Sequence, residues 1–220
     1  MTADLTHIDT WLFDLDNTLY PEESGFMQGV ESRITAFVAK VTGLEHDAAY
    51  SLQKHYLAEH GLTLKGLMLH HGVDPADFHA LFHDLSLDLL AKDPELVAAI
   101  ARLPGRRLIF TNADDKHAER VLAHLNLRGL FDDVFHIHSF GFAPKPDPLG
   151  FQRMIDAHGL TPASTAFFED SERNLHPAAD LGMTTVLVGS RALASTADFV
   201  HHRTEKLTPF LSSARLKETA

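Results

Sequence analysis

Short apolar runs alternate with helix-like segments along much of the chain. Such runs, bounded by polar residues, are typical of buried strands, and an apolar period near 3.6 residues is typical of amphipathic helices. The pattern predicts strands over 10–15, 107–110, 134–137, 165–168 and 184–188, with a last short one at 199–201. It predicts helices over 114–125, 148–158 and 173–181. This alternation indicates an α/β fold with helices on both faces of a parallel sheet.

The stretch after the first strand carries only the helical period. Before Gly43, one predicted helix presents a single apolar face made of Val30, Ile34, Phe37, Val38 and Val41. A second helix is predicted over 47–60, followed by Gly61 as its C-terminal signal. A third begins at Asp74-Pro75, an N-cap before a first-turn proline, and its apolar face holds Phe78, Leu81, Phe82, Leu85 and Leu89.

We therefore predict two domains. An α/β core is made of residues 1–19 and 91–220, and an all-helical domain over 20–90 is inserted after the first strand. Within the core, Asp93-Pro94 begins a further helix that Pro104-Gly105 ends. The tail from Ser212 is polar, and we expect it to fray.

Composition narrows the functions that such a chain can carry. Its 220 residues include 19 Lys and Arg, 30 Asp and Glu and no Cys, for a net charge of −11. The lack of cysteine excludes a disulfide scaffold, a thiolate zinc site and a cysteine nucleophile. The acidic surplus argues against a nucleic acid polymer as partner, and no apolar run is long enough to span a membrane. The N-terminus MTADLTHIDT has no basic stretch, so we expect a cytoplasmic protein without a signal peptide.

Chemically active side chains follow the predicted strands. In open parallel sheets, ligands bind beyond the carboxyl ends of the strands. Four acidic residues, a Thr-Asn pair and a lysine occupy such positions: Asp14, Asp16, Thr111, Asn112, Lys145, Glu169 and Asp170. Although they come from distant parts of the sequence, we expect them to lie along one edge of the sheet.

Four carboxylates in one pocket would repel one another unless a hard divalent cation lay among them. Oxygen ligands without thiols favour Mg²⁺ over Zn²⁺. A pocket that combines Mg²⁺ with a lysine, a threonine hydroxyl and exposed backbone N–H groups suits a phosphoryl group. One carboxylate could attack phosphorus while another, two residues away, moves protons.

These segments resemble, in order, the four motifs of the haloacid dehalogenase-like (HAD) hydrolase superfamily. They are Asp14-Leu15-Asp16-Asn17-Thr18, Thr111-Asn112, Lys145 and Glu169-Asp170-Ser171, and the resemblance spans residues 10–190. It implies a Rossmann-like core and identifies the insertion as a helical cap. Asn17 in place of the more common glycine, Tyr20-Pro21, and the segment from Phe168 to Leu175 resemble the pyrimidine 5′-nucleotidase branch.

The resemblance implies catalytic roles for five residues. Asp14 would be the nucleophile that forms an aspartyl-phosphate. Asp16 would protonate the leaving group and then activate water. Thr111 and the backbone N–H of Asn112 would bind the phosphoryl group, and Lys145 would neutralise its charge and orient the nucleophile.

The resemblance also implies a magnesium site. Its ligands would be Asp14, the backbone carbonyl of Asp16, Glu169 directly or through water, and Asp170, while Asn174 would support the loop after the fourth strand. Dehalogenase members, which need no Mg²⁺, lack a carboxylate at the position of Asp16. This sequence therefore resembles the phosphatases.

The predicted reaction is hydrolysis of a small phosphomonoester, with a nucleoside 5′-monophosphate, such as a pyrimidine nucleotide, as the leading substrate class. A phosphatase acting on a sugar phosphate or phosphoglycolate, and a mutase resembling β-phosphoglucomutase, would use the same core residues. A catalytically idle binding protein and a His-rich metal-binding protein are the non-enzyme alternatives. The sequence has neither of the Gly-rich loops that hold nucleotide cofactors.

The 16 histidines are the other candidate ligands. His79 and His83 stand four residues apart on a predicted helix, a spacing that metal pairs use. Further pairs are His70 with His71, His136 with His138, and His201 with His202. Because no H-E-x-x-H sequence accompanies them, we interpret the histidines as solvated side chains rather than as metal ligands.

Overall fold

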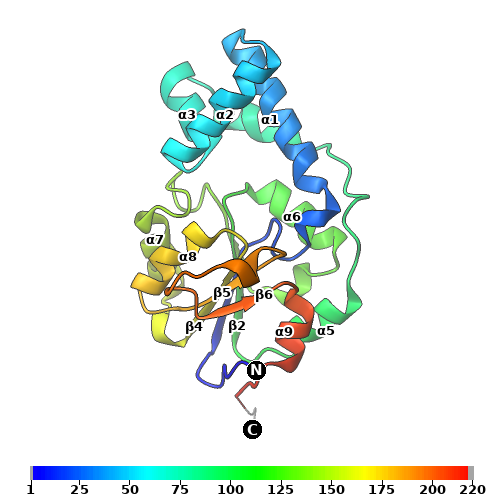
Figure 1. Cartoon of the computed structure of the whole chain (residues 1–220), viewed down its shortest axis with the longest axis vertical. Coiled ribbons are helices and arrows are strands. Elements are labelled where there is room, and N and C mark those ends of the chain that lie inside the picture. Colours follow the sequence, from blue (N-terminus) through cyan, green and yellow to red (C-terminus); the bar gives the residue numbers. More distant parts are fainter. Residues whose placement is uncertain (1, 218–220) are drawn as a thin grey trace. The chain divides into compact units, whose positions relative to one another are not determined.

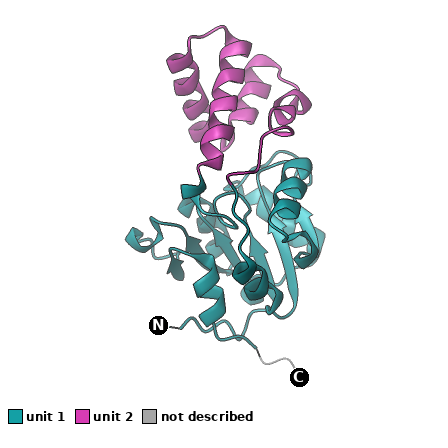
Figure 2. Cartoon of the chain, turned by 90° about the vertical axis from the view of Figure 1, so that its right-hand side faces the viewer, with its two compact units in different colours: residues 1–24, 90–220 teal, residues 25–89 magenta. Residues whose placement is uncertain are grey.

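The computed structural model of the chain describes residues 2–217. It divides into two compact units, one formed by residues 1–24 and 90–220 and the other by residues 25–89 (Figure 2). The first unit contains the whole sheet, and the second contains only helices. None of the helices in residues 2–217 is long and apolar enough to cross a membrane.

The first unit is built on a six-stranded parallel sheet. Its strands are β1 (Thr10–Phe13), β2 (Arg106–Phe110), β3 (Asp133–Phe135), β4 (Thr165–Glu169), β5 (Thr184–Val188) and β6 (His202–Thr204). They lie in the order β3-β2-β1-β4-β5-β6, and every neighbouring pair is parallel. This is the order of Rossmann-type sheets, so the predicted α/β fold is confirmed. The carboxyl ends of β1, β2 and β4 are neighbours at one edge.

Helices cover both faces of this sheet (Figure 1). They are α5 (Pro94–Ala101), α6 (Asp115–His124), α7 (Pro148–His158), α8 (Glu172–Asp180) and α9 (Leu207–Ser213). Several begin at the aspartates that the sequence indicates. Asp93 and Asp147, for example, accept backbone N–H groups of the first turns of α5 and α7.

Aromatic rings fill the space between the sheet and its helices. On one face, the rings of Phe13 and Phe168 stack with centroids 4.6 Å apart, and Phe168 also meets Phe210 of α9. On the other face, Phe110 packs edge-on against Phe151 of α7 at 5.0 Å. Strand residues alternate between faces, so the two clusters lie on opposite sides of the sheet. This packing fixes the strand ends that carry the site.

The second unit is a helical bundle of α1 (Phe26–Thr42), α2 (His46–His60), α3 (Thr63–His71) and α4 (Pro75–His79). Helices α1 and α2 end at Gly43 and Gly61, both with positive φ, as the sequence predicts. Helix α3 was not predicted as a separate helix. Helix α3 packs so closely on α2 that a Cβ at Gly66 would lie only 2.3 Å from the ring of Tyr56.

The helix predicted from Asp74 through Leu89 is wrong in its length. Helix α4 ends at His79, a 3₁₀ turn follows over Ala80–Phe82, and Leu89 is 59% exposed. The Arg33 side chain donates to the carbonyl of Leu81, which a continuing helix would use for the N–H of Leu85. That N–H bonds to Phe82 instead.

The last strand also differs from its prediction at 199–201. The Thr185 hydroxyl donates to the carbonyl of Phe199 at 2.6 Å, and the Thr185 N–H donates to Nδ1 of His201 at 3.0 Å. These bonds use groups that a strand ladder would need, and β6 therefore starts at His202.

The expectation that the chain frays from Ser212 is wrong for the residues that the structure describes. Leu207 and Leu211 of α9 are buried, and the guanidinium of Arg102, the residue after α5, donates to the carbonyls of Ser212 and Ala214. The Arg215 N–H donates to Ala3, and the Leu5 N–H returns a bond to Arg215. Residues 218–220 of the predicted tail lie outside the described part.

Candidate active site

A buried lysine joins the ends of three neighbouring strands. The Nζ of Lys145 donates to Oδ1 of Asp14 at 2.6 Å, to Oε2 of Glu169 at 2.8 Å and to the carbonyl of Phe110 at 2.7 Å. The lysine is 1% exposed and Asp14 7%. The ammonium also lies 5.1 Å and 5.3 Å from the ring centroids of Phe110 and Phe167. The topology thus brings together residues 131 positions apart in the chain.

This environment shifts the pKa values of both partners. Burial opposes the charge of Lys145, but Asp14 and Glu169 outweigh it, so the pKa of the ammonium is raised and the lysine is charged. Burial and the charge of Glu169 raise the pKa of Asp14 to about 7, although Lys145 opposes that rise. The Asp14 carboxyl therefore holds a proton far more readily than an exposed aspartate.

Three acidic residues form a group that could hold a cation. Asp14, Glu169 and Asp170 each offer an oxygen, and these oxygens lie within 4.8 Å of one another. Burial, followed by the charges of Glu169 and Asp14, raises the pKa of Asp170 to about 9. When all three carboxylates are ionised, one ammonium leaves two negative charges uncompensated. The charge and the oxygen donors both fit a hard divalent cation.

The fourth predicted acid, Asp16, lies in a different environment. Its Oδ1 accepts the Tyr20 hydroxyl at 2.6 Å and lies 2.9 Å from Nε2 of His117. Burial raises the pKa of Asp16, but the charge and hydrogen bond of His117, together with the bond from Tyr20, outweigh burial and lower it. The pKa of His117 is raised, because Asp16 outweighs the burial of the ring. The two aspartates of one loop are therefore tuned in opposite directions.

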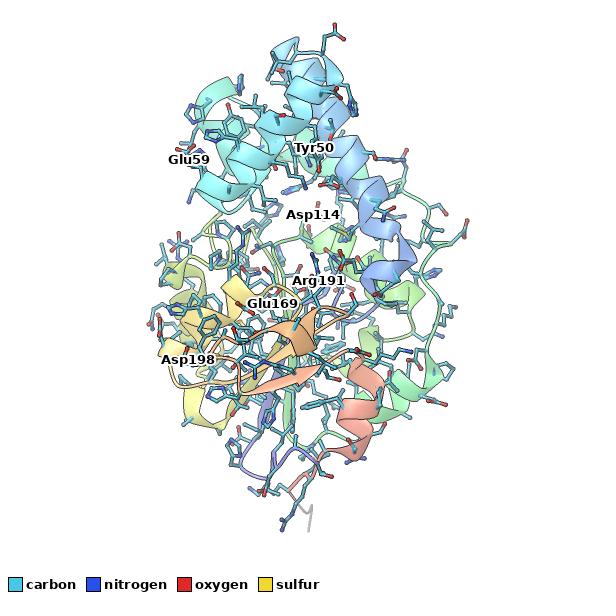
Figure 3. All side chains as sticks on the ribbon, in the orientation of Figure 1. Tyr50, Glu59, Asp114, Glu169, Arg191 and Asp198 are labelled. Carbon is cyan, nitrogen blue, oxygen red and sulfur yellow. The ribbon has the colours of Figure 1, made fainter. Side chains whose placement is uncertain are left out.

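Sequence reasoning did not find His117 as a site residue. It lies in the first turn of α6, where its N–H donates to the N-cap Asp114 at 2.7 Å. Figure 3 labels Asp114, just before this helix, and Glu169, at the end of β4. The position of His117, early in the helix that follows β2, was the available signal. The nucleotidase-like motif includes Tyr20 but does not indicate its contact with Asp16.

The loop after β1 has its own stabilising contacts. The hydroxyl of Thr18 donates to Oδ2 of Asp14 at 3.2 Å, which gives the second oxygen of that carboxylate a partner. Asn17 has φ of 60°, a left-handed conformation that asparagine tolerates better than most residues. Asparagine is therefore compatible with the backbone conformation at this position.

Thr111 and Asn112 follow β2, and the side chains of both make hydrogen bonds within the protein. The buried Thr111 hydroxyl accepts the Ala113 N–H at 3.0 Å. The Asn112 amide donates to the carbonyl of Lys145 at 3.1 Å, and its oxygen accepts the Lys145 N–H at 2.9 Å. The Asn112 side chain thus fixes the backbone of the lysine, a role that the sequence did not indicate.

Asn174 lies buried in α8, beyond the carboxylate group. Its Oδ1 has no hydrogen-bond partner among the described residues. A cavity of about 430 Å³ in the first unit lies beside Asp170. Its wall includes Asn17, Ser171 and Arg191, whose guanidinium donates to the Glu22 carboxylate at 3.3 Å. Its wall also includes apolar side chains such as Leu187 and Val188, so polar and apolar groups both line the cavity.

The site residues lie within a segment that a sequence model of the haloacid dehalogenase-like hydrolases matches, at residues 8–182. The chain belongs to this family. Phosphate metabolism protein 8 of Saccharomyces cerevisiae is 30% identical over 193 residues, which cover 80% of this chain and 60% of the relative. The GMP/IMP nucleotidase YrfG of Escherichia coli is 33% identical over 78 residues, covering 36% and 35% of the two chains. The chain therefore spans less than two thirds of these curated relatives.

Solved structures share the HAD fold. A HAD phosphatase from Thermococcus onnurineus superposes with a TM-score of 0.62 at 19% identity, covering 98% of this chain and 100% of the other. A dehalogenase with an intermediate complex superposes with a TM-score of 0.64 at 17% identity, covering 95% and 98%. Because both phosphatases and dehalogenases superpose at such identities, these structures establish the fold and leave the reaction to be argued from the site.

Proposed function

We propose that this HAD-family protein is a Mg²⁺-dependent phosphatase that hydrolyses a small phosphomonoester through an aspartyl-phosphate on Asp14. The observation that carries the proposal is the arrangement at the ends of β1 and β4. The Asp14 carboxylate accepts a hydrogen bond from the buried Lys145 ammonium and lies close to the carboxylates of Glu169 and Asp170. Asp16 follows Asp14 by two residues. A phosphatase needs this combination of nucleophile, metal ligands and proton carrier.

In this proposal, Asp14 attacks phosphorus while its other contacts hold it in place. The Lys145 ammonium fixes Oδ1 and the Thr18 hydroxyl contacts Oδ2. The ammonium also neutralises charge on the phosphoryl group. Thr111, at the end of the adjacent strand β2, supplies its hydroxyl to a phosphoryl oxygen.

Asp16 moves the protons. Because its pKa is lowered in the free protein, Asp16 must take up a proton before the first step, in which it donates that proton to the leaving alkoxide. In the second step it takes a proton from the water that attacks the aspartyl-phosphate. His117 and Tyr20 hold its carboxylate in a fixed position. A dehalogenation reaction has no leaving oxygen to protonate, so the presence of Asp16 favours phosphoryl transfer.

Mg²⁺ would be held by Asp14, the backbone carbonyl of Asp16, Glu169 and Asp170. The cation would neutralise the charge of the carboxylates and of the phosphoryl group, which allows an anionic nucleophile to approach an anionic substrate. The raised pKa values of Asp14 and Asp170, which are caused by burial and by the neighbouring carboxylates, support this assignment, because a cation would relieve the repulsion among these groups.

For the substrate we propose a nucleoside 5′-monophosphate. The support is the nucleotidase-like motif around Asn17 and Tyr20, together with the nucleotidase named among the relatives. The cavity beside Asp170, which both polar and apolar groups line, could receive part of the leaving nucleoside. The helical domain predicted over 20–90 would act as the cap that selects among leaving groups.

A panel of phosphomonoesters tests the proposal. We expect phosphate release from pyrimidine and purine monophosphates in Mg²⁺, with kcat/KM above that for sugar phosphates and phosphoglycolate. Chelation by EDTA should abolish it and added Mg²⁺ restore it. Equal kcat/KM across the panel would reject the nucleotide as the preferred substrate but not the phosphatase activity. Turnover that is indifferent to chelation, or activity on haloacids instead, would reject the phosphatase.

A further inference from the structure

A second group of potential metal ligands shares no residue with the first. Asp115, His136 and His138 each offer one ligand atom, and these atoms lie within 4.8 Å of one another. Within residues 2–217, the only such groupings of at least three acidic or histidine side chains are this one and the carboxylates of the active site. The candidate pair His79 and His83 belongs to neither.

The start of α6 and the turn after β3, both in the first unit, carry these three residues. Asp115 is the first residue of α6, whereas His136 and His138 lie in the turn that follows β3. Between the two histidines, the Ile137 N–H donates to the carbonyl of Ala113 at 3.0 Å. This backbone bond ties the turn to the loop before α6, so the backbone holds the three residues near one another.

The two rings are arranged as separate ligands. The ring planes of His136 and His138 meet edge-to-face, with centroids 5.6 Å apart and an interplanar angle of 78°. The Nδ1 of His136 is shielded from solvent and has no hydrogen-bond partner among the described residues. Burial lowers the pKa of His136, and the charge of Asp115 opposes that shift.

We infer that Asp115, His136 and His138 form a binding site for a first-row transition metal such as Zn²⁺. Two imidazoles and one carboxylate suit Zn²⁺, Co²⁺ or Ni²⁺, whereas Mg²⁺ prefers a set of oxygen ligands. Ligand atoms around tetrahedral Zn²⁺ lie roughly 3.4 Å apart. Because Asp115 and His138 are exposed, their side chains can close that remaining distance. Three protein ligands leave a coordination position for water or another group.

This site has two imidazole ligands, whereas the proposed magnesium site has only oxygen ligands. The two sites should therefore prefer different metals, and binding at each can be measured separately. The site lies at the same edge of the sheet as the catalytic residues, since it follows β2 and β3. It shares no ligand with the proposed magnesium site, so metal binding here does not depend on whether the protein is a phosphatase.

Titration of the untagged, metal-free protein with Co²⁺ in excess Mg²⁺ tests the inference, because visible Co²⁺ absorption reports imidazole ligation. We expect one equivalent to bind, and Zn²⁺ to displace it. The variants His138→Ala and Asp115→Asn should each weaken binding at least about tenfold. The control His176→Ala removes another exposed histidine and should leave the affinity unchanged.

Circular dichroism of each variant reports whether the fold is retained. An Asp170→Asn variant shows which part of the Co²⁺ signal comes from the active site. The inference is overturned if all bound Co²⁺ is lost in Asp170→Asn. It is equally overturned if folded His138→Ala and Asp115→Asn bind Co²⁺ and Zn²⁺ within twofold of the unsubstituted protein.

Discussion

The Nζ of Lys145 lies 2.6 Å from Oδ1 of Asp14, and almost no solvent reaches either group. The same ammonium contacts Glu169 at 2.8 Å, so one cation is shared by two buried carboxylates. A buried charge is tolerated only when it is paired and hydrogen-bonded. The lysine therefore links the stability of this part of the fold to the chemistry proposed for Asp14.

Replacing this lysine should destabilise the protein as well as inactivate it. Lys145→Met removes the ammonium but keeps most of the apolar stem, and leaves Asp14 and Glu169 without their cation. We expect the free energy of unfolding to fall by about 3 kcal/mol at pH 8 without metal, measured by urea denaturation. The loss should shrink at pH 6, where Asp14 takes up a proton. Lys116→Met, at an exposed position, is the control, and an equal loss there would contradict the account.

The contact between His117 and Asp16 predicts a kinetic effect. His117→Gln keeps a hydrogen-bond donor of similar reach but removes the positive charge, so Asp16 is held less firmly. We expect kcat for a nucleotide substrate to fall about tenfold with KM changed less than twofold. The loss should be smaller with p-nitrophenyl phosphate, whose leaving group needs no proton. A rise in KM at unchanged kcat would instead place His117 in substrate binding.

Metal binding should be coupled to pH. The pKa values of Asp14 and Asp170 are raised to about 7 and about 9, so the folded, metal-free protein holds protons that the unfolded chain releases. The stability from these groups is complete at low pH and is lost as the pH rises through those values. Mg²⁺ replaces the protons.

The gain in Tm on adding Mg²⁺ should therefore be larger at about pH 8 than at about pH 5.5. Calorimetric scans with and without the cation at both pH values measure this difference. In Asp170→Asn the dependence on pH should be reduced. A gain that is larger at the lower pH would contradict the assignment of these carboxylates as metal ligands.

The Asn112 side chain predicts a positioning effect through the lysine backbone. Asn112→Ala removes both hydrogen bonds to Lys145, and we expect a loss of about 2 kcal/mol in the free energy of unfolding. Activity should fall because the ammonium is no longer fixed against Asp14. Gln152→Ala removes an exposed amide bonded to Asp156 and serves as control. Unchanged stability in Asn112→Ala would show that the two bonds contribute nothing net.

Much of the fold could be predicted because its signals are local. The strand ends at Asp14 and Glu169 follow short apolar runs, and the helix starts at Asp93 and Asp147 carry their own caps. Helix α3 was missed because its apolar residues form no clear stripe. The end of α4 depends on Arg33, which lies 48 positions away from the carbonyl that it binds.

In the candidate site, too, contacts between residues far apart in the sequence were harder to predict than local features. The strand ends predicted that Asp14 and Glu169 would meet, and the order of the motifs added Lys145. The structure places the three in hydrogen-bonding contact. The contact between His117 and Asp16 joins residues 101 positions apart through side chains, and no local pattern encodes it. The grouping of Asp115 with two histidines depends likewise on how two loops pack.

Detection of a phosphoryl group on Asp14 tests the central claim most directly. The variant Asp16→Asn lacks the base for hydrolysis, whereas p-nitrophenyl phosphate needs no acid to leave, so the intermediate should accumulate. After acid quenching and proteolysis, we expect peptide mass spectrometry to find one phosphoryl group on Asp14, and none in the double variant with Asp14→Asn. An unmodified Asp14 despite release of p-nitrophenol, or full turnover by Asp14→Asn alone, would contradict the account.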